Sequence, residues 1–169
     1  MPARYLIEPL AKGHDRSSFA CGSEALDAYL RQQARQDGER GVAAPFVLIE
    51  PPARTVLGYY TLSASAVDAG DLPEEFRKKL PRYPQMPVTL LGRLAVDRSR
   101  KGKRLGELLL MDALHKSLYG AAEIAAIAVF VDAKDASAKA FYEHFDFIAL
   151  PRSPRRLFLP MQTIARLFA

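Results

Sequence analysis

The chain has 169 residues, 49% of them hydrophobic, and a formal net charge of +5 at pH 7. These values predict one globular domain and favour anionic partners such as phosphates or nucleic acid, although a modest basic excess is also typical of an ordinary solvated surface. The single cysteine, Cys21, excludes an internal disulfide and a cysteine-based zinc site, and the three histidines lack metal-ligand spacing. No apolar run reaches ~18 residues and the N-terminus lacks a signal-peptide core, so we expect a cytoplasmic protein with no metal.

Short apolar segments alternate with turn residues through the first half of the chain. The pattern first predicts a strand over 4–10 and a polar loop over 14–23, whose Ser23 caps a helix over 24–40. It then predicts hairpin strands over 46–50 and 55–67. A helix over 71–80, capped by Asp71, and a proline-rich connector over 81–87 follow. Because hairpin strands run antiparallel, we expect this half of the sheet to be antiparallel.

The second half alternates buried strands with helices. It predicts a strand over 88–97, a loop over 98–106, a leucine-rich helix over 105–120, a strand over 124–133, a helix over 137–145, strands over 147–150 and 155–161, and a helical turn over 162–169. This order across 88–150 implies parallel strands with a covering helix. We therefore expect an α/β domain over 1–169 with a mixed central sheet flanked by helices.

The loop over 98–106 reads R-S-R-K-G-K-R-L-G and leads directly into the leucine-rich helix. A glycine-containing loop between a strand and a helix can bind an anion, because free backbone N–H groups and the helix dipole both favour negative charge. The loop matches neither the P-loop nor the dinucleotide-binding fingerprint. By itself it could equally be an ordinary turn with solvated charges.

Two longer blocks give this loop a context. Residues 91–110 read L-G-R-L-A-V-D-R-S-R-K-G-K-R-L-G-E-L-L-L, and residues 129–147 read V-F-V-D-A-K-D-A-S-A-K-A-F-Y-E-H-F-D-F. In this order and separation they resemble the acetyl-CoA segment and the following strand and helix of the GNAT acetyltransferase family. The resemblance implies a GNAT-like domain whose parallel strands splay around an acetyl-CoA site.

The resemblance also implies which residues bind acetyl-CoA. Backbone groups of one strand would pair with the pantetheine arm, and the loop amides would hold the pyrophosphate. The implied set is Leu94, Ala95, Val96, Lys101, Gly102, Lys103, Arg104, Leu105, Gly106, Asp132, Ala133 and Phe141. Two residues depart from the family pattern: Lys101 replaces Arg or Gln, and Arg104 replaces Gly or Ala. The bulk of Arg104 is expected to hinder access to the amides.

Acetyl transfer to an amine needs a proton for the departing thiolate. Tyr142 matches the family's tyrosine and is the candidate acid; without the resemblance, a packed aromatic is the simpler interpretation. Residues 88–96 contain no carboxylate, whereas many family members keep a general base there. An α-amine, with a pKa near ~7.7–8, needs less help than a lysine near ~10.4. The missing base therefore favours an α-amine acceptor, such as that of an aminoacyl ester.

The first half resembles one branch of the family, the toxins of toxin–antitoxin modules that acetylate aminoacyl-tRNA. The matching residues are H-D-R-S-S-F-A-C-G-S-E-A-L-D-A-Y-L-R-Q-Q-A over 14–34 and G-Y-Y-T-L-S over 58–63. The branch often has Asp and Trp where this chain has Ala20 and Tyr29. The resemblance implies a homodimer, an aminoacyl-tRNA substrate and a ribbon-helix-helix antitoxin.

Arginines are the candidate tRNA contacts, because they bind phosphates with a planar fork. We expect this role for Arg31, Arg35, Arg93, Arg98 and Arg100. Further basic groups lie over 77–82 and 152–156, and each group alone could be a solvated face. The leading hypothesis is an acetyltransferase that modifies charged tRNA and blocks translation. The alternatives are a GNAT enzyme acting on a small amine or a protein N-terminus, and a non-catalytic binding module with the same fold.

Overall fold

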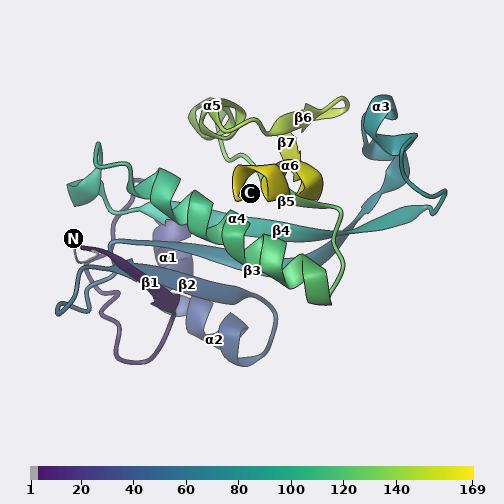
Figure 1. Cartoon of the computed structure of the whole chain (residues 1–169). Coiled ribbons are helices and arrows are strands. Elements are labelled where there is room, and N and C mark those ends of the chain that lie inside the picture. Colours follow the sequence, from purple (N-terminus) through teal and green to yellow (C-terminus); the bar gives the residue numbers. More distant parts are fainter. Residues whose placement is uncertain (1–3) are drawn as a thin grey trace. The chain divides into compact units, whose positions relative to one another are not determined.

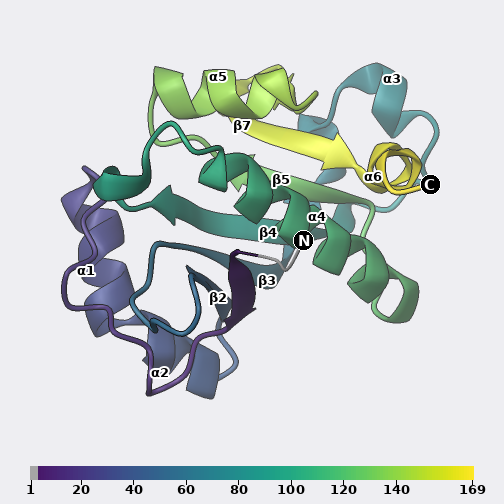
Figure 2. The ribbon, with the colours of Figure 1, turned by 60° about the vertical axis from the view of Figure 1, so that its left-hand side comes forward.

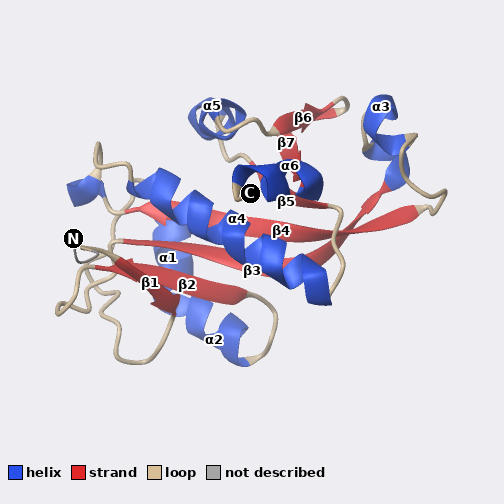
Figure 3. Cartoon of the chain, in the orientation of Figure 1, coloured by secondary structure: helices blue, strands red, loops and turns tan. Residues whose placement is uncertain are grey.

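The computed structural model describes residues 4–169. Its strands form one mixed sheet in the order β1-β2-β3-β4-β5-β7-β6, with helices against it (Figure 3). The chain divides into two compact units, one running to Ser63 and returning for Gly92–Ala113, the other comprising Ala64–Leu91 and Leu114–Ala169. Strands β3 (Gly58–Asp68) and β4 (Gln85–Val96) and helix α4 (Leu105–Glu123) each contribute to both units. Within residues 4–169, no helix is long and apolar enough to cross a membrane.

The first unit begins with antiparallel strands, as predicted. Strand β1 (Leu6–Pro9) pairs with β2 (Ala44–Ile49), which pairs with the start of β3 so that Phe46 lies opposite Tyr60. The rings of Phe46 and Tyr60 stack with centroids 5.2 Å apart. The predicted hairpin is therefore confirmed, and an aromatic cross-strand pair supports its register.

The helix predicted over 24–40 is instead two helices, α1 (Glu24–Gln32) and α2 (Ala34–Glu39). Ser23 caps α1 as expected, its hydroxyl accepting a hydrogen bond from the Leu26 N–H. Gln33 breaks the helix at φ −123°, and its side-chain amide donates to the Asp37 carboxylate. The Tyr29 hydroxyl donates to the same carboxylate at 2.7 Å. These side-chain contacts hold the break in place, and apolar periodicity does not report them.

Two consecutive tyrosines define the layers of the first unit. Tyr59 and Tyr60 on β3 point to opposite faces of the sheet because side chains alternate along a strand. The Tyr59 hydroxyl donates to the Leu26 carbonyl of α1, whereas the Tyr60 hydroxyl donates to Asp112 of α4 at 2.5 Å. Strand β3 therefore lies between α1 and the first half of α4, and both tyrosine rings are fully buried.

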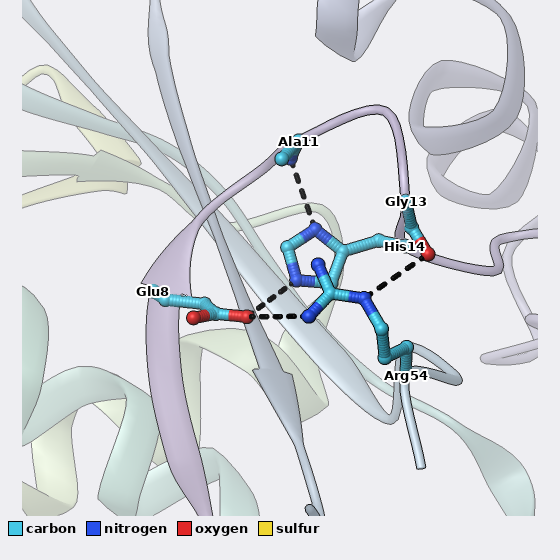
Figure 4. A network of polar contacts seen from close by, with 5 residues as sticks. All are labelled: Glu8, Ala11, Gly13, His14 and Arg54. Atoms are coloured by element: carbon cyan, nitrogen blue, oxygen red, sulfur yellow. Dashed lines mark hydrogen bonds and ion pairs between the residues drawn. The ribbon is translucent and has the colours of Figure 1, made fainter. Parts of the chain in front are cut away.

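A polar network fixes the loop that follows β1 (Figure 4). The buried His14 accepts a hydrogen bond from the Ala11 N–H at Nδ1, so Nε2 carries the proton and donates to Glu8 at 2.7 Å. Arg54 donates to the Gly13 carbonyl, and its guanidinium lies 3.9 Å from the same Glu8 oxygen. Both ring nitrogens of the buried imidazole thus have hydrogen-bond partners within the protein.

The second unit contains the parallel strands. Strand β5 (Ala128–Asp132) pairs parallel with β4, as predicted, with Thr89 opposite Val129. The third strand of this segment, β6 (Ile148–Leu150), runs in the same direction as β5 but does not pair with it, because β7 (Ser153–Pro160) lies between them and is antiparallel to both. The last strand of the chain thus pairs with β5. Local periodicity cannot predict this pairing, because it depends on contacts between segments far apart in the sequence.

Three predicted boundaries also change in this unit. The helix over 71–80 is a 3-10 turn at Ala69–Asp71 followed by the short α3 (Glu74–Arg77), whose N-cap is Pro73, so Asp71 does not cap it. Proline lacks an N–H and prevents one continuous helix. Helix α4 extends to Glu123 and leaves β5 shorter than predicted. Helices α5 (Ala136–His144) and α6 (Met161–Leu167) match the predictions closely.

Candidate functional site

The loop before α4 is held by Asp97, the last residue before the 3-10 turn at Arg98–Arg100. Its carboxylate accepts hydrogen bonds from the Ala20 N–H at 2.9 Å, from the Ser99 N–H at 3.1 Å and from the Ser99 hydroxyl at 2.5 Å. Partial burial alone would raise the pKa of Asp97. The hydrogen bonds and nearby Arg98 outweigh that effect and lower the pKa. A charged Asp97 therefore ties the loop to the segment that precedes α1.

The first turn of α4 presents free backbone donors. The Leu108 N–H already bonds the Arg104 carbonyl, whereas the N–H groups of Leu105, Gly106 and Glu107 have no partner within residues 4–169. Such donors carry the positive end of the helix dipole. Gly58 lets α4 approach the sheet closely, since a Cβ there would lie 2.8 Å from Leu109. The first unit thus has free N–H donors at the helix start, and anion binding there stays a prediction.

Two residues of the loop adopt left-handed backbone conformations. Gly102 has φ +79° and Arg104 has φ +59°. Glycine takes such angles at little cost, whereas a residue with a Cβ is strained there by roughly 1–2 kcal/mol. The preference for glycine at the position of Arg104 therefore has a backbone reason. The exposed Arg104 side chain has no partner in the described chain.

The strand expected to pair with the pantetheine arm ends at Val96. Ala95 is buried in the apolar cluster around Tyr59, while Leu94 and Val96 are half-buried. The Ala95 side chain is therefore committed to the core, so only its backbone is available to a ligand.

Tyr142 lies in the second unit, on α5. The side chain of Asp135 caps this helix by accepting from the Ala138 N–H at 2.8 Å. The Tyr142 ring packs edge-on against Phe141 and at a tilt against Phe147, both with centroids 5.3 Å away. Only 7% of the residue is exposed, and this burial raises the pKa of Tyr142. No other described residue forms a hydrogen bond with its hydroxyl, so the phenol stays protonated and unpaired.

Two further second-unit residues expected at the cofactor lie at the end of β5: Asp132 is its last residue, and Ala133 comes directly after it. Asp132 is exposed and lies 3.4 Å from the Arg156 Nε, whereas Ala133 is buried. The Ala133 N–H donates to the Arg155 carbonyl at 2.8 Å. The start of the β5–α5 loop is therefore fixed by β7.

Four of the five arginines expected to contact tRNA have partners inside the first unit. Arg31 donates to the Phe19 carbonyl at 2.7 Å, Arg35 pairs with Glu39 at 2.8 Å, and Arg100 lies 3.4 Å from Glu50. Arg98 is exposed, and its side chain has no partner among residues 4–169.

Arg93 is the most tightly held of these arginines. Its guanidinium carbon lies 3.5 Å from the centroid of the Tyr29 ring, a cation–π contact. Burial, followed by the hydrogen bond to Asp37, raises the pKa of Tyr29 to about 12, and nearby Arg93 partly offsets this. Neither basic composition nor periodicity signals this stack, because Arg93 and Tyr29 are far apart in the sequence.

We compared the sequence and the fold with those of known proteins. No family model matches the sequence. Among solved structures, a tyrosine-to-phenylalanine mutant of KacT superposes with a TM-score of 0.92 and 32% identity, covering 98% of this chain and 100% of that chain. AtaT complexed with acetyl-methionyl-tRNAfMet superposes with a TM-score of 0.91 and 32% identity, covering 98% of this chain and 99% of that chain. A tyrosine-to-phenylalanine mutant of AtaT, bound to acetyl-CoA and the C-terminus of the antitoxin AtaR, superposes with a TM-score of 0.84 and 29% identity, covering 99% of each chain. The fold is thus that of the GNAT toxins.

Curated relatives narrow the class. The chain is 37% identical to the tRNA-acetylating toxin of Mycobacterium tuberculosis, with 90% of each chain covered. It is 30% identical to the probable toxin TacT of Sinorhizobium fredii, with 98% of this chain and 96% of the relative covered. The chain belongs to the family of tRNA-acetylating toxins.

Proposed function

We propose that the chain transfers the acetyl group of acetyl-CoA to the α-amine of an aminoacyl-tRNA and thereby blocks translation. The observation that carries this proposal is the nearly full-length similarity to AtaT, which was solved with acetyl-methionyl-tRNAfMet. The toxin from Mycobacterium tuberculosis supports the same reaction by its name and by its 37% identity.

The start of α4 fits the diphosphate of acetyl-CoA. Three unpaired N–H groups, those of Leu105, Gly106 and Glu107, supply donors with the helix dipole behind them. Lys101 and Lys103 are exposed beside them and add positive charge. When bound, acetyl-CoA supplies the acetyl group as a reactive thioester. Of the remaining predicted contacts, Leu94 and Val96 would act through backbone groups. Asp132, Ala133 and Phe141 stay predicted cofactor contacts on the family resemblance alone.

The absence of a carboxylate from one strand indicates the kind of amine that accepts the acetyl group. Residues 88–96 carry no carboxylate, so the acceptor must lose its proton without a base on this strand. An α-amine near pKa ~7.7–8 is substantially neutral at physiological pH, which favours an aminoacyl ester. Tyr142 donates its phenolic proton to the departing sulfur and regains one from the acylated nitrogen. Its raised pKa keeps that proton available across the physiological range.

The same relatives suggest the partners. AtaT has been solved with the C-terminus of the antitoxin AtaR, and this chain would have a comparable ribbon-helix-helix antitoxin. It would act as a homodimer. Its charged-tRNA substrate would place it in the cytoplasm.

The test is transfer of radiolabelled acetyl from acetyl-CoA to a pool of charged tRNA, with Tyr142→Phe assayed in parallel. Label on the α-amine of charged tRNA, lost in the variant, is the expected result. If label appears only on small amines or protein N-termini, the acceptor is wrong. If acetyl-CoA fails to raise the thermal stability of the protein, the chain lacks the cofactor site altogether.

A further inference from the structure

A compact excursion joins β3 to β4 within the second unit, and we call residues 69–84 the β3–β4 excursion (Figures 1 and 2). Its ends meet: the Ala69 N–H donates to the Pro84 carbonyl at 2.9 Å. The Gln85 side chain bonds Asp68 at 3.2 Å just outside that closure. Loops of this length with joined ends are compact and frequently functional.

Apolar residues anchor the inner side of the excursion. Leu72 is only 3% exposed, and Leu80 packs on the same core cluster. The Phe76 ring lies 5.2 Å from that of Phe158 on β7. Prolines at 73, 81 and 84 restrict the backbone further. The excursion is therefore preorganised, and a ligand would not have to order it.

The outer side carries cations that the protein itself does not use. Arg77, Lys78, Lys79 and Arg82 are exposed, and their side chains have no ion-pair or hydrogen-bond partner among residues 4–169. Tyr83 beside them is 65% exposed. Four unpaired cations next to an exposed aromatic ring favour a ligand that offers both negative charge and a flat surface.

Three of these four cations and Tyr83 line a hollow. It has a volume of 620 Å³, and its lining includes Arg77, Lys78, Arg82 and Tyr83, with Glu74 as the only carboxylate. This volume is in the range of small-ligand pockets, about 300–1,000 Å³. A smaller hollow of 210 Å³ shares Arg77 and adds Arg152, although Asp71 and Glu74 also line it. A nucleotide fits the larger hollow in size and charge.

We propose that the β3–β4 excursion binds an unstacked nucleotide of the RNA substrate. Tyr83 would stack on the base, which is how proteins hold single-stranded nucleotides without sequence preference. Arg77 and Arg82 would hold the flanking phosphates with their forked donors, and Lys78 would add a point charge. The inference rests on the proposed function for the identity of the RNA, a tRNA. An acidic polypeptide would use the cations but would leave the ring without a role.

The test is equilibrium binding of uncharged tRNA, measured by fluorescence anisotropy at several salt concentrations. We expect Arg77→Ala with Arg82→Ala to weaken binding at least about tenfold and to reduce the slope of log Kd against log salt by about 2. Tyr83→Ala should weaken binding about tenfold without changing that slope, and Tyr83→Phe should bind like the wild type. Lys12→Ala, which removes an exposed and unpaired charge elsewhere, is the matched control and should have little effect.

Several outcomes would overturn the inference. One is wild-type affinity and salt slope in the double arginine variant. A second is loss of binding in the arginine variant with none in Tyr83→Ala. A third is unchanged tRNA binding with loss of binding to polyglutamate, which would make the surface a polypeptide site. Urea unfolding of each variant shows that it is folded. Because uncharged tRNA is not acetylated, the expected binding pattern would stand even if the acetyl-transfer assay failed.

Discussion

Three arginines of the first unit and those of the β3–β4 excursion differ in what holds their guanidinium groups. Arg31 bonds a carbonyl, Arg35 an acidic side chain, and Arg93 the face of an aromatic ring, all within the first unit. Arg77 and Arg82 have no such partner in the described chain. Both groups look alike in a charge count. A cation with an internal partner stabilises the fold, whereas one left unpaired on a rigid support is free to bind a ligand.

Tyr142 provides the sharpest test of this contrast, because its ring is buried while its hydroxyl has no partner in the described chain. We expect Tyr142→Phe to lower acetyl transfer by about 10²–10⁴-fold, the usual contribution of a general acid. Its free energy of unfolding should stay nearly unchanged, since no hydrogen bond is lost. Steady-state kinetics and urea unfolding measure the two effects. A variant that is fully active, or one that is clearly destabilised, would contradict the assignment.

His14 is the opposite case, a buried side chain with two partners. We expect His14→Ala to destabilise the protein by about 2–3 kcal/mol, because the Ala11 N–H and the Glu8 carboxylate both lose a bond in a half-buried site. Arg54→Ala removes an exposed charge and an exposed hydrogen bond to the Gly13 carbonyl, and it should cost less than about 1 kcal/mol. Equal losses in the two variants, measured by urea unfolding, would show that burial is not the deciding factor.

Arg93 tests whether an arginine that stabilises the fold through an internal partner also binds tRNA. Arg93→Ala should cost about 1–2 kcal/mol of unfolding free energy by removing the stack on Tyr29. It should leave the affinity for uncharged tRNA within about twofold of wild type, since its guanidinium is already engaged. Lower tRNA affinity with unchanged stability would instead support Arg93 as a tRNA contact and remove it from the internally paired group.

Arg104 tests the strain in the cofactor loop. We expect Arg104→Gly to raise the free energy of unfolding by up to about 1 kcal/mol, because glycine relieves the left-handed strain but adds entropy to the unfolded chain. Acetyl-CoA affinity should stay the same or rise as the amides become more accessible. Isothermal titration measures that affinity. A marked loss would show that the Arg104 charge, and not only the backbone, holds the diphosphate.

Asp97 gives the smallest effect, and it depends on pH. Its pKa is lowered in the folded state, so its charged form contributes stability above the unfolded value near ~3.9 and loses it as the pH falls through the folded value. We expect Asp97→Asn to be less stable than wild type by about 1 kcal/mol at pH 7, and this gap should close as the pH falls through the lowered folded pKa of Asp97. Urea midpoints across this range check the sign, and a gap that widens on acidification would refute it.

Much of the architecture could be predicted from local pattern. The Ser23 cap, the hairpin around Pro51 and the strand, loop and helix from Val88 onward follow from turn chemistry and apolar spacing. The position of β7 between β5 and β6 could not, because pairing between distant strands depends on the whole chain. The free N–H groups at the start of α4 could also be predicted, since a loop followed by a helix leaves them without intrahelical partners.

The sequence by itself determined which chemistry is available: a glycine loop before a helix, a tyrosine on α5, no carboxylate in residues 88–96, and an excess of arginine. The tertiary structure decided which of those groups are free. It set Arg93 on Tyr29 and Arg31 on the Phe19 carbonyl, and it left the cations around Tyr83 unpaired. The physical reason is that charge and propensity are local properties, whereas burial and pairing depend on neighbours brought together by folding.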